Sequence, residues 1–135
     1  MSPGGGRRLK GMFKDTKAFS GFAVDDVAAA ERFYGEVLGI ETSVAHGILT
    51  LALDGGARPT IAYPKPGHVP AEYTILNFPV EDIEAAVDAL VERGVEILRY
   101  DGLEQDARGI MRAGGPYIAW FADPAGNVLS VLQER

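Results

Sequence analysis

The stretch VDDVAAAERFYGEVLG, residues 24–39, decides the fold because a related stretch, VEDIEAAVDALVERG, recurs at residues 80–94. In both copies apolar side chains follow the three- and four-residue spacing of an amphipathic helix. An aspartate precedes each predicted helix and a glycine follows it, as is typical of residues that cap helix ends. Val24 and Val80 are 56 residues apart, and Asp26 and Asp82 have the same separation. The chain therefore consists of two related halves.

Short apolar segments around both helices predict β-strands. Residues 18–23 precede the first helix, and residues 73–80 precede the second. Glycine, proline, aspartate and asparagine separate the other segments, as expected for strands joined by turns. Asp-Gly-Gly at 54–56 and Asp-Pro-Ala-Gly-Asn at 123–127 have the composition of hairpin turns. The segments after the helices are 40–47, 48–56 and 59–66 in the first half, and 95–102, 117–126 and 127–134 in the second.

Each half thus has the order strand, helix, strand, strand, strand. Two βαβββ modules predict an α+β fold with a curved, eight-stranded mixed sheet, helices on its outer face, and a concave face free to hold a ligand. We expect a single domain over residues 17–135, with modules at about 17–66 and 72–133 and a linker at 67–72. A ferredoxin-like fold is the competitor, but its βαββαβ order has too few strands for these segments.

The composition excludes several classes of function. The chain has 135 residues, the length of one domain, and no apolar stretch is long enough for a membrane helix. Its net charge of −6 opposes binding to nucleic acid or to anionic membranes. Without cysteine it has no disulfide and no thiolate nucleophile or metal ligand. Residues 1–16 lack the apolar core of a secretory signal, so we expect a flexible N-terminal arm and a cytoplasmic location.

The chain resembles the vicinal oxygen chelate superfamily, which includes glyoxalase I, bleomycin-resistance proteins and extradiol dioxygenases. Three patterns carry the resemblance: V-x-D-x-x-A-A-x-x-F-Y-x-x-V-L-G at 24–39, V-x-D-I-x-A-A-x-x-x-L-x-x-x-G at 80–94, and F-x-D-P-x-G-N-x-L at 121–129. Their order extends the resemblance over roughly residues 17–133. The combination is specific for the fold, whereas none of the three patterns is specific for a substrate.

The resemblance also implies where a metal is held, and this chain departs from the family pattern there. In metal-using members each half supplies one ligand from its opening strand and one from a late strand. The opening positions here hold Phe19 and Ile75, and the late position of the second half holds Ser130. Residues 61–63, near the remaining position, contain no histidine or carboxylate. Divalent cations need such ligands, so we expect no metal and no cofactor.

Strand alternation predicts which side chains line the concave face together with these positions. The predicted lining is apolar and aromatic with few polar groups, which is typical of a small-molecule pocket. As a binding residue Trp120 would stack on a flat ligand, whereas the structural alternative, which is the more common role of a tryptophan, is that it fills the core. The alternative for the whole set is that the side chains only pack on one another. The candidate ligand-binding residues are Phe19, Tyr73, Ile75, Asn77, Trp120 and Ser130.

The predicted loop at residues 99–117 carries Arg108 and Arg112. Long loops of this kind often cover a binding face, so either arginine can pair with an anionic group of a ligand. The alternative is that both are solvated charges of an exposed loop.

The leading hypothesis is a metal-independent binding protein, similar to the drug-sequestering resistance proteins, that holds a small, partly aromatic or amphipathic molecule. No catalytic residue is assigned, because the predicted concave face offers no carboxylate or imidazole as a base. The rival is an enzyme: a metal-free isomerase or lyase in which Tyr73 or Asn77 polarises a carbonyl, or a metalloenzyme with a relocated site at His46 and His68. A partner-binding module is a third alternative. The resemblance also implies a homodimer.

Overall fold

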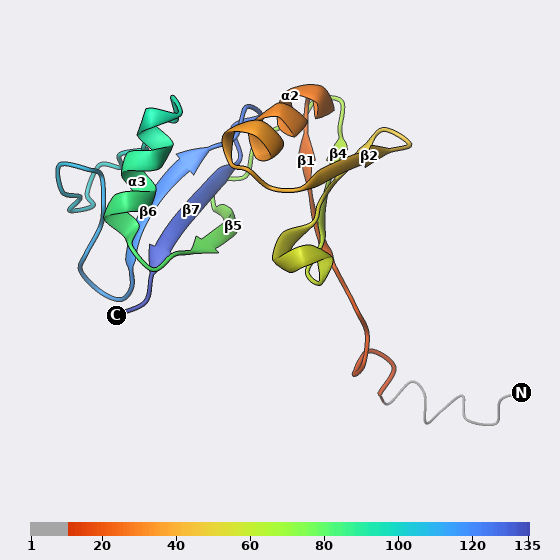
Figure 1. The fold of residues 1–135 in the computed structure, drawn as a ribbon, viewed down its shortest axis with the longest axis horizontal. Helices are drawn as coiled ribbons and strands as arrows, with labels where there is room; N and C mark the ends of the chain where they lie inside the picture. The colour runs from red at the N-terminus through yellow and green to blue at the C-terminus, as the bar shows by residue number, and fades with distance from the viewer. Residues whose placement is uncertain (1–10) are drawn as a thin grey trace, which may run out of the picture.

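Two separate sheets, one from each half of the chain, form the frame of the protein (Figure 1). The computed structural model describes residues 11–135. The first sheet has the order β1-β4-β3-β2 and consists of β1 (Ser20–Val24), β2 (Thr42–Ala45), β3 (Ile48–Leu51) and β4 (Thr60–Pro64). The second has the order β5-β7-β6 and consists of β5 (Thr74–Pro79), β6 (Tyr117–Ala122) and β7 (Val128–Gln133). The α+β class is confirmed, but in place of one eight-stranded sheet the described residues form two sheets with seven strands.

The strand pairing is the same in both modules. The opening strand pairs in parallel with the last strand of its own module, as β1 does with β4 and β5 does with β7. The last strand then pairs antiparallel with the strand before it, as β4 does with β3 and β7 does with β6. This shared order confirms that the chain contains a structural repeat.

The segment at residues 95–102, predicted as the eighth strand, forms no regular strand. Its expected place is the edge beyond β6, where β2 lies in the first sheet. One backbone hydrogen bond, from the Leu98 N–H to the Trp120 carbonyl at 2.8 Å, joins the segment to β6. The side-chain amide of Gln105 takes the adjacent backbone groups: it donates to the Leu98 carbonyl and accepts from the Tyr100 N–H. Farther along the same edge, Met111 exchanges two backbone hydrogen bonds with Ile118 of β6, so isolated contacts take the place of a regular strand here.

The two predicted helices are present as α2 (Val27–Glu31) and α3 (Ile83–Glu92). Asp26 and Asp82 each accept, at 3.1 Å, a hydrogen bond from the backbone N–H three residues ahead. Such bonds satisfy donors that the first turn of a helix leaves without a partner. The predicted capping role of these aspartates is confirmed.

The first helix does not continue as a uniform α-helix, which corrects the sequence-based expectation. After α2 the chain winds into a wider π-helix, η1 (Arg32–Val37), and the Leu38 N–H donates to the Phe33 carbonyl five residues back at 2.9 Å. The widened turn lies against the second module, where the Phe33 and Phe121 rings are 6.4 Å apart between centroids. In Figure 1 this helical ribbon lies between the two sheets.

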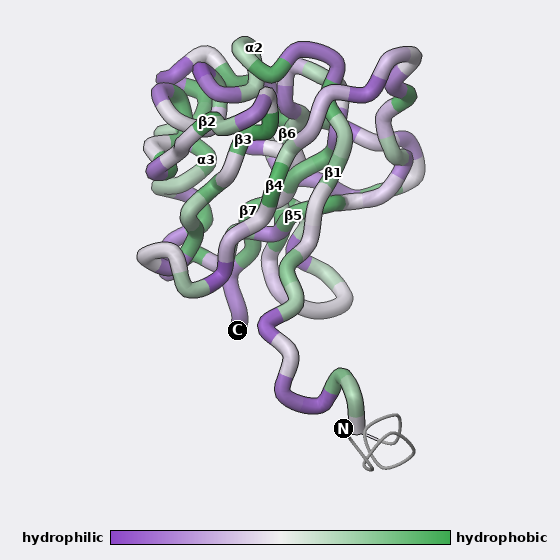
Figure 2. The backbone as a smooth tube through the Cα atoms, turned by 90° about the vertical axis from the view of Figure 1, so that its right-hand side faces the viewer, coloured by the Kyte–Doolittle hydropathy of each residue, from purple (hydrophilic) through white to green (hydrophobic). Residues whose placement is uncertain are grey.

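Buried apolar side chains connect both sheets to their helices. Figure 2 shows hydrophobic stretches along the strands of both modules. Burying one such side chain contributes roughly 1.5–3 kcal/mol before the loss of conformational entropy is counted. The largest fully buried side chains are Tyr34, Phe121, Leu49, Leu51, Ile83, Ile110, Leu129, Val24 and Val87.

A short 3-10 helix, η2 (Leu53–Gly56), joins β3 to β4, where the sequence predicted a hairpin turn.

The predicted N-terminal arm at residues 1–16 lies largely outside the described residues, which begin at residue 11. From residue 11 onward, every helix is too short or too polar to cross a lipid bilayer.

Candidate functional site

A cavity of about 490 Å³ lies at the linker, where the two modules meet. Its walls come from β1, from β4 and the residues after it, and from the start of β5. Apolar and aromatic surface is supplied by Phe22, Tyr63, Tyr73 and Ile75. The polar or charged side chains in the lining are Ser20, Thr60, Lys65, His68, Thr74 and Asn127, and the lining contains no carboxylate.

A tight turn at residues 65–68 brings two basic side chains to this cavity. The His68 N–H donates to the Lys65 carbonyl at 3.1 Å, which closes a β-turn, and Gly67 has a φ of 70°. Proline at the second position and a positive-φ glycine at the third are typical of a type II turn. The Lys65 N–H also donates to the Val24 carbonyl at 3.0 Å, which ties the turn to the end of β1.

Two hydroxyl groups of the cavity wall are already fully engaged. Thr60 Oγ1 donates to the Ser20 carbonyl at 2.8 Å, and the two hydroxyl oxygens are 2.9 Å apart. A hydroxyl carries a single proton, so Ser20 is the donor in the bond between the two side chains. Neither proton is left to donate to a ligand.

His68 carries the one buried side-chain nitrogen or oxygen in residues 11–135 that has no hydrogen-bond partner, its Nε2. A buried polar atom left without a partner costs about 1–3 kcal/mol. The imidazole lines the cavity beside Lys65. Sequence reasoning considered His68 only as a metal ligand together with His46 and missed Lys65, although the Lys-Pro-Gly-His pattern at 65–68 was a readable turn signal.

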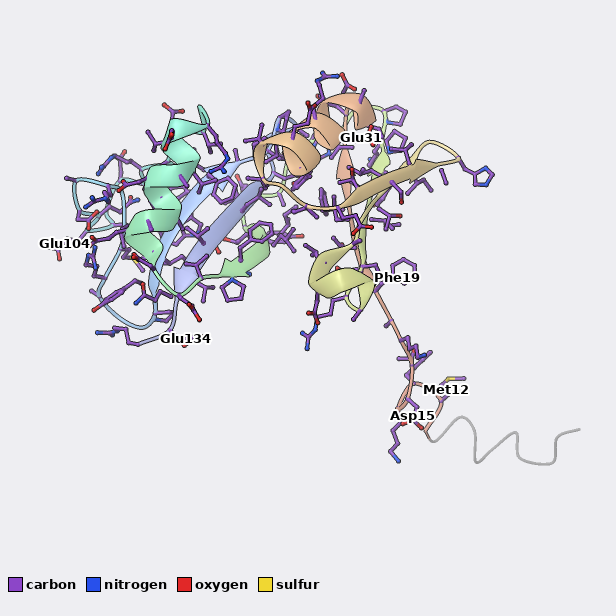
Figure 3. All side chains as sticks on the ribbon, in the orientation of Figure 1. Met12, Asp15, Phe19, Glu31, Glu104 and Glu134 are labelled. Carbon is purple, nitrogen blue, oxygen red and sulfur yellow. The ribbon has the colours of Figure 1, made fainter. Side chains whose placement is uncertain are left out.

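The structure brings only two of the six sequence-predicted site residues to this cavity. Tyr73 and Ile75 line it, and the Tyr73 side chain is exposed. Phe19 does not line it: its side chain is 62% exposed at the start of β1 and lies beside a different hollow with Arg58 and Pro59. In Figure 3, Phe19 lies on the side of the first module away from the second sheet.

The other three candidates lie together on the second sheet. Ser130 pairs with Asn77 across one strand boundary and with Trp120 across the other. The Ser130 hydroxyl is buried and donates to Asn77 Oδ1 at 2.6 Å. Trp120 is half-buried and meets Tyr100 edge to face, with ring centroids 5.5 Å apart. Ser130 and Asn77 are hydrogen-bonded to each other, and none of the three residues lines the cavity.

Arg108 and Arg112 do not face the cavity, which corrects the idea that they hold a ligand anion. Arg108 Nε lies 3.0 Å from Asp88 Oδ1, and Arg112 Nη2 lies 2.7 Å from Glu84 Oε2. Both carboxylates belong to α3, so the two arginines fasten the loop after residue 99 onto this helix. Such ion pairs at the surface contribute little to stability singly.

The segment at residues 121–129 forms the turn between β6 and β7 and also makes hydrogen bonds to the first module. Asn127 Nδ2 donates to the Ala23 carbonyl of β1 at 2.8 Å and to Asp123 Oδ2 at 3.1 Å. Asp123 also accepts the hydroxyl of Tyr34 at 2.7 Å. The turn between β6 and β7 therefore attaches the second module to the first, directly behind the cavity wall.

A family comparison agrees with this two-module architecture. The model of the Glyoxalase/Bleomycin resistance protein/Dioxygenase superfamily matches residues 18–131. The chain belongs to this superfamily. A comparison with curated proteins finds no match.

Solved structures of this superfamily share the fold over most of their length. TnmS3, an antibiotic binding protein from Streptomyces sp. CB03234, is 24% identical with a TM-score of 0.64, covering 90% of this chain and 98% of that one. A superfamily member from Sphaerobacter thermophilus is 25% identical with a TM-score of 0.64, covering 87% and 96%. The fosfomycin resistance protein FosX from Mesorhizobium loti is 11% identical with a TM-score of 0.62, covering 90% and 93%.

The residues at the superfamily's metal positions do not fit a divalent cation in this chain. Phe19 and Ile75 have no donor atoms, and the Ser130 hydroxyl is committed to Asn77. Across the part of the chain that the structure describes, no three histidine, aspartate or glutamate side chains gather closely enough to hold a metal. His46 lies in the β2–β3 turn, at the opposite sheet edge from β1 and the cavity.

Proposed function

We propose that this superfamily member binds a small, partly aromatic or amphipathic molecule, without a metal, in the cavity at the linker. One observation carries the proposal: the cavity of about 490 Å³ has aromatic walls, and no carboxylate lines it. The volume is within the range of about 300–1,000 Å³ that is usual for small-molecule sites. The fold similarity to an antibiotic binding protein supports binding of a small molecule as the role.

The first test is a thermal-shift screen with a library of natural products, antibiotics and aromatic metabolites, run with and without a chelator. A ligand present at 100 times its Kd stabilises the folded state by about 2.7 kcal/mol. We expect stabilisation by aromatic or amphipathic compounds that is unchanged by the chelator and weakened by Ile75→Asn. Val91→Asn is the control, because this side chain is exposed on α3 and lies outside the cavity.

Two results would contradict the proposal. One is the absence of any compound with a Kd below about 1 mM, which corresponds to only about 4 kcal/mol of binding free energy. The other is tight binding that Val91→Asn and Ile75→Asn weaken equally, because the ligand would then bind elsewhere.

A metal-free isomerase or lyase is the second candidate, and one observation favours it. The cavity contains the His68 imidazole, whereas the sequence-based reasoning expected no imidazole on the ligand face. An imidazole within reach of a substrate proton is a competent general base. The two candidates differ in the fate of a bound compound. Mass spectrometry and NMR should recover it unchanged after long incubation if the protein only binds it, whereas conversion that His68→Asn abolishes would favour the enzyme.

We also propose a homodimer, as the superfamily resemblance implies. Large hydrophobic side chains remain exposed on the described chain near the cavity, among them Val69 and Tyr73, and Phe19 is exposed at the start of β1. A second copy that covers them would remove apolar surface from water. Light scattering at several concentrations should give twice the monomer mass of 14.4 kDa. Phe19→Asp and Tyr73→Asp should shift the equilibrium towards the monomer, and a mass of one chain at all concentrations would contradict the proposal.

A further inference from the structure

We propose that the molecule bound in the cavity carries an acidic group, a carboxylate or a phosphonate, recognised by Lys65 and His68 at the two ends of one β-turn. This inference rests on the proposed binding function and names the chemical class of the ligand. It differs from the expectation of an apolar, aromatic pocket with few polar groups, because it assigns a charge to the ligand and two specific partners for that charge.

The turn holds the two basic side chains together without help from a ligand. Lys65 and His68 occupy its first and fourth positions, and the hydrogen bond between their backbones measures 3.1 Å. Pro66 restricts one backbone angle, and Gly67 adopts a positive φ that other residues adopt only with strain. The bond from the Lys65 N–H to the Val24 carbonyl fixes the turn on β1. Such a preorganised pair loses little conformational freedom on binding.

Among the nitrogen-bearing side chains of the cavity lining, Lys65 and His68 are the two without a hydrogen-bond partner within residues 11–135. The hydroxyl protons of Ser20 and Thr60 are both used within the wall. The two amide protons of Asn127 go to the Ala23 carbonyl and to Asp123. Lys65 makes no ion pair within residues 11–135, and His68 Nε2 has no partner there.

The charge around the cavity also favours an anion. The chain as a whole has a net charge of −6, yet no aspartate or glutamate lines this cavity. Lys65 is an exposed residue of the cavity lining with no carboxylate partner within residues 11–135, and it attracts a negatively charged group that enters the cavity. Hydrogen bonds in which one partner is ionised are shorter and stronger than neutral ones. An acidic ligand would therefore gain more from this cavity than its neutral analogue.

Neighbouring protein atoms cover His68 Nε2, so a ligand reaches it only after a small shift of the wall. The residues that follow His68 include Val69 and Tyr73, whose side chains are exposed and free of packing constraints on one side. A shift of residues 69–73, with the turn at 65–68 kept in place, would let the unpartnered imidazole nitrogen bond to the ligand. Binding and movement of this segment are expected to occur together.

The test compares three probes that share one aromatic group: 2-naphthylacetate, (2-naphthylmethyl)phosphonate and the neutral 2-naphthylacetamide. Calorimetry should show at least one acid binding about tenfold or more tightly than the amide, as expected for one charge-assisted hydrogen bond. Lys65→Gln and His68→Asn should each lower the affinity for the acid about tenfold and leave the amide unchanged. The controls Lys14→Gln and His46→Asn remove the same groups outside the cavity and should have no effect.

The outcomes separate this inference from the proposed function. Equal affinities for acid and amide would overturn the acidic-ligand inference and leave the binding function standing, as would equal losses for both probes in the two cavity variants. If none of the three probes binds, and the broader screen also yields no ligand, the binding function fails and the inference fails with it. If His68→Asn does not fold by circular dichroism, Lys65→Gln and the acid-to-amide comparison on the unaltered chain still decide the question.

Discussion

The Tyr34 hydroxyl donates a 2.7 Å hydrogen bond to Asp123 Oδ2 and so joins the helical segment of the first module to the β6–β7 turn of the second. The two residues are 89 positions apart in the chain, and both are buried. Asp123 Oδ1 accepts two further bonds from the backbone N–H groups of Ala125 and Asn127. A buried carboxylate with this many donors is stable in the folded state. The docking of the modules thus depends on this group.

Tyr34→Phe should lower the free energy of unfolding by about 1–3 kcal/mol, because it leaves a buried carboxylate oxygen short of one donor. Urea denaturation followed by circular dichroism measures the change. Tyr100→Phe is the matched control: its ring is partly exposed, and we expect a change within about 0.5 kcal/mol. Equal effects of the two substitutions would show that the bond to Asp123 does not stabilise the fold.

Stability should fall at high pH because of the same tyrosine. Burial raises the pKa of Tyr34 above its ordinary value, and the charge and hydrogen bond of Asp123 raise it further. Tyr34 therefore keeps its proton when folded, whereas the unfolded chain loses it near pH 10. Above that pH the free energy of unfolding should decrease by about 1.4 kcal/mol per pH unit from this group alone. Denaturation curves between about pH 9 and 11.5 should show a steeper decrease for the unaltered chain than for Tyr34→Phe. Parallel decreases would argue against the raised pKa.

Asn127→Asp should destabilise the protein more than Asn127→Ala. The alanine variant removes the bond to the Ala23 carbonyl and should cost about 1–3 kcal/mol. The aspartate variant instead places a second carboxylate next to the Ala23 carbonyl and the Asp123 carboxylate. All three groups are hydrogen-bond acceptors, so they repel one another without a shared proton. Chemical denaturation at neutral pH gives both values. An aspartate variant at least as stable as the alanine variant would show that the amide does not act as a donor here.

Gly109→Ala should be more destabilising than Gly102→Ala, although both glycines have nearly the same φ, 89° and 87°. A Cβ atom at position 109 would lie 2.5 Å from Ile97 Cγ2, whereas one at position 102 would meet nothing within 4 Å. The shared cost of a positive φ is roughly 1–2 kcal/mol, and the steric contact should add about 1–3 kcal/mol. The difference between the two thermal unfolding curves measures the contact alone, and equal curves would mean that Ile97 moves aside freely.

Arg108→Gln should raise the pKa of Asp88 towards its ordinary value. Arg108 donates from Nε and Nη2 to the two oxygens of Asp88, at 3.0 and 3.2 Å, and these bonds lower the pKa of this carboxyl. Because the folded pKa is lowered, the pair stabilises the fold fully at neutral pH and stops doing so as the pH falls through that pKa. NMR titration of the carboxyl carbon should show the rise in the variant. An unchanged titration curve would indicate that the pair is open in solution.

Local features of the chain were sufficient to predict the secondary structure that the two halves share. The helical spacing, the caps at Asp26 and Asp82 and the turn at 123–127 depend on neighbours within a few residues, so they can be read from the sequence. The same pattern identified the superfamily. The winding of the first helix into a π-helix at 32–37 was not readable, because packing against Phe121 is a tertiary contact.

The location of the candidate site depends on contacts between segments that are distant in the sequence, and no local pattern predicts such contacts. Where a strand was expected at 95–102, the Gln105 amide bonds the backbone, and Met111 pairs with Ile118 of β6. Of the predicted site residues, Tyr73 and Ile75 reach the cavity because β5 begins beside β1, whereas Ser130 is held by Asn77 on the second sheet.

Residue type and short-range spacing were enough to predict the repeated strand–helix order, the two capped helices, the turn at 123–127 and the lack of metal-binding side chains at Phe19, Ile75 and Ser130. Contacts between distant segments set how the modules dock, through Tyr34, Asp123 and Asn127, and where the cavity opens. They also decide that Lys65 and His68 face that cavity. The physical reason is that burial and hydrogen bonding between distant segments are settled together, when the two modules pack against each other.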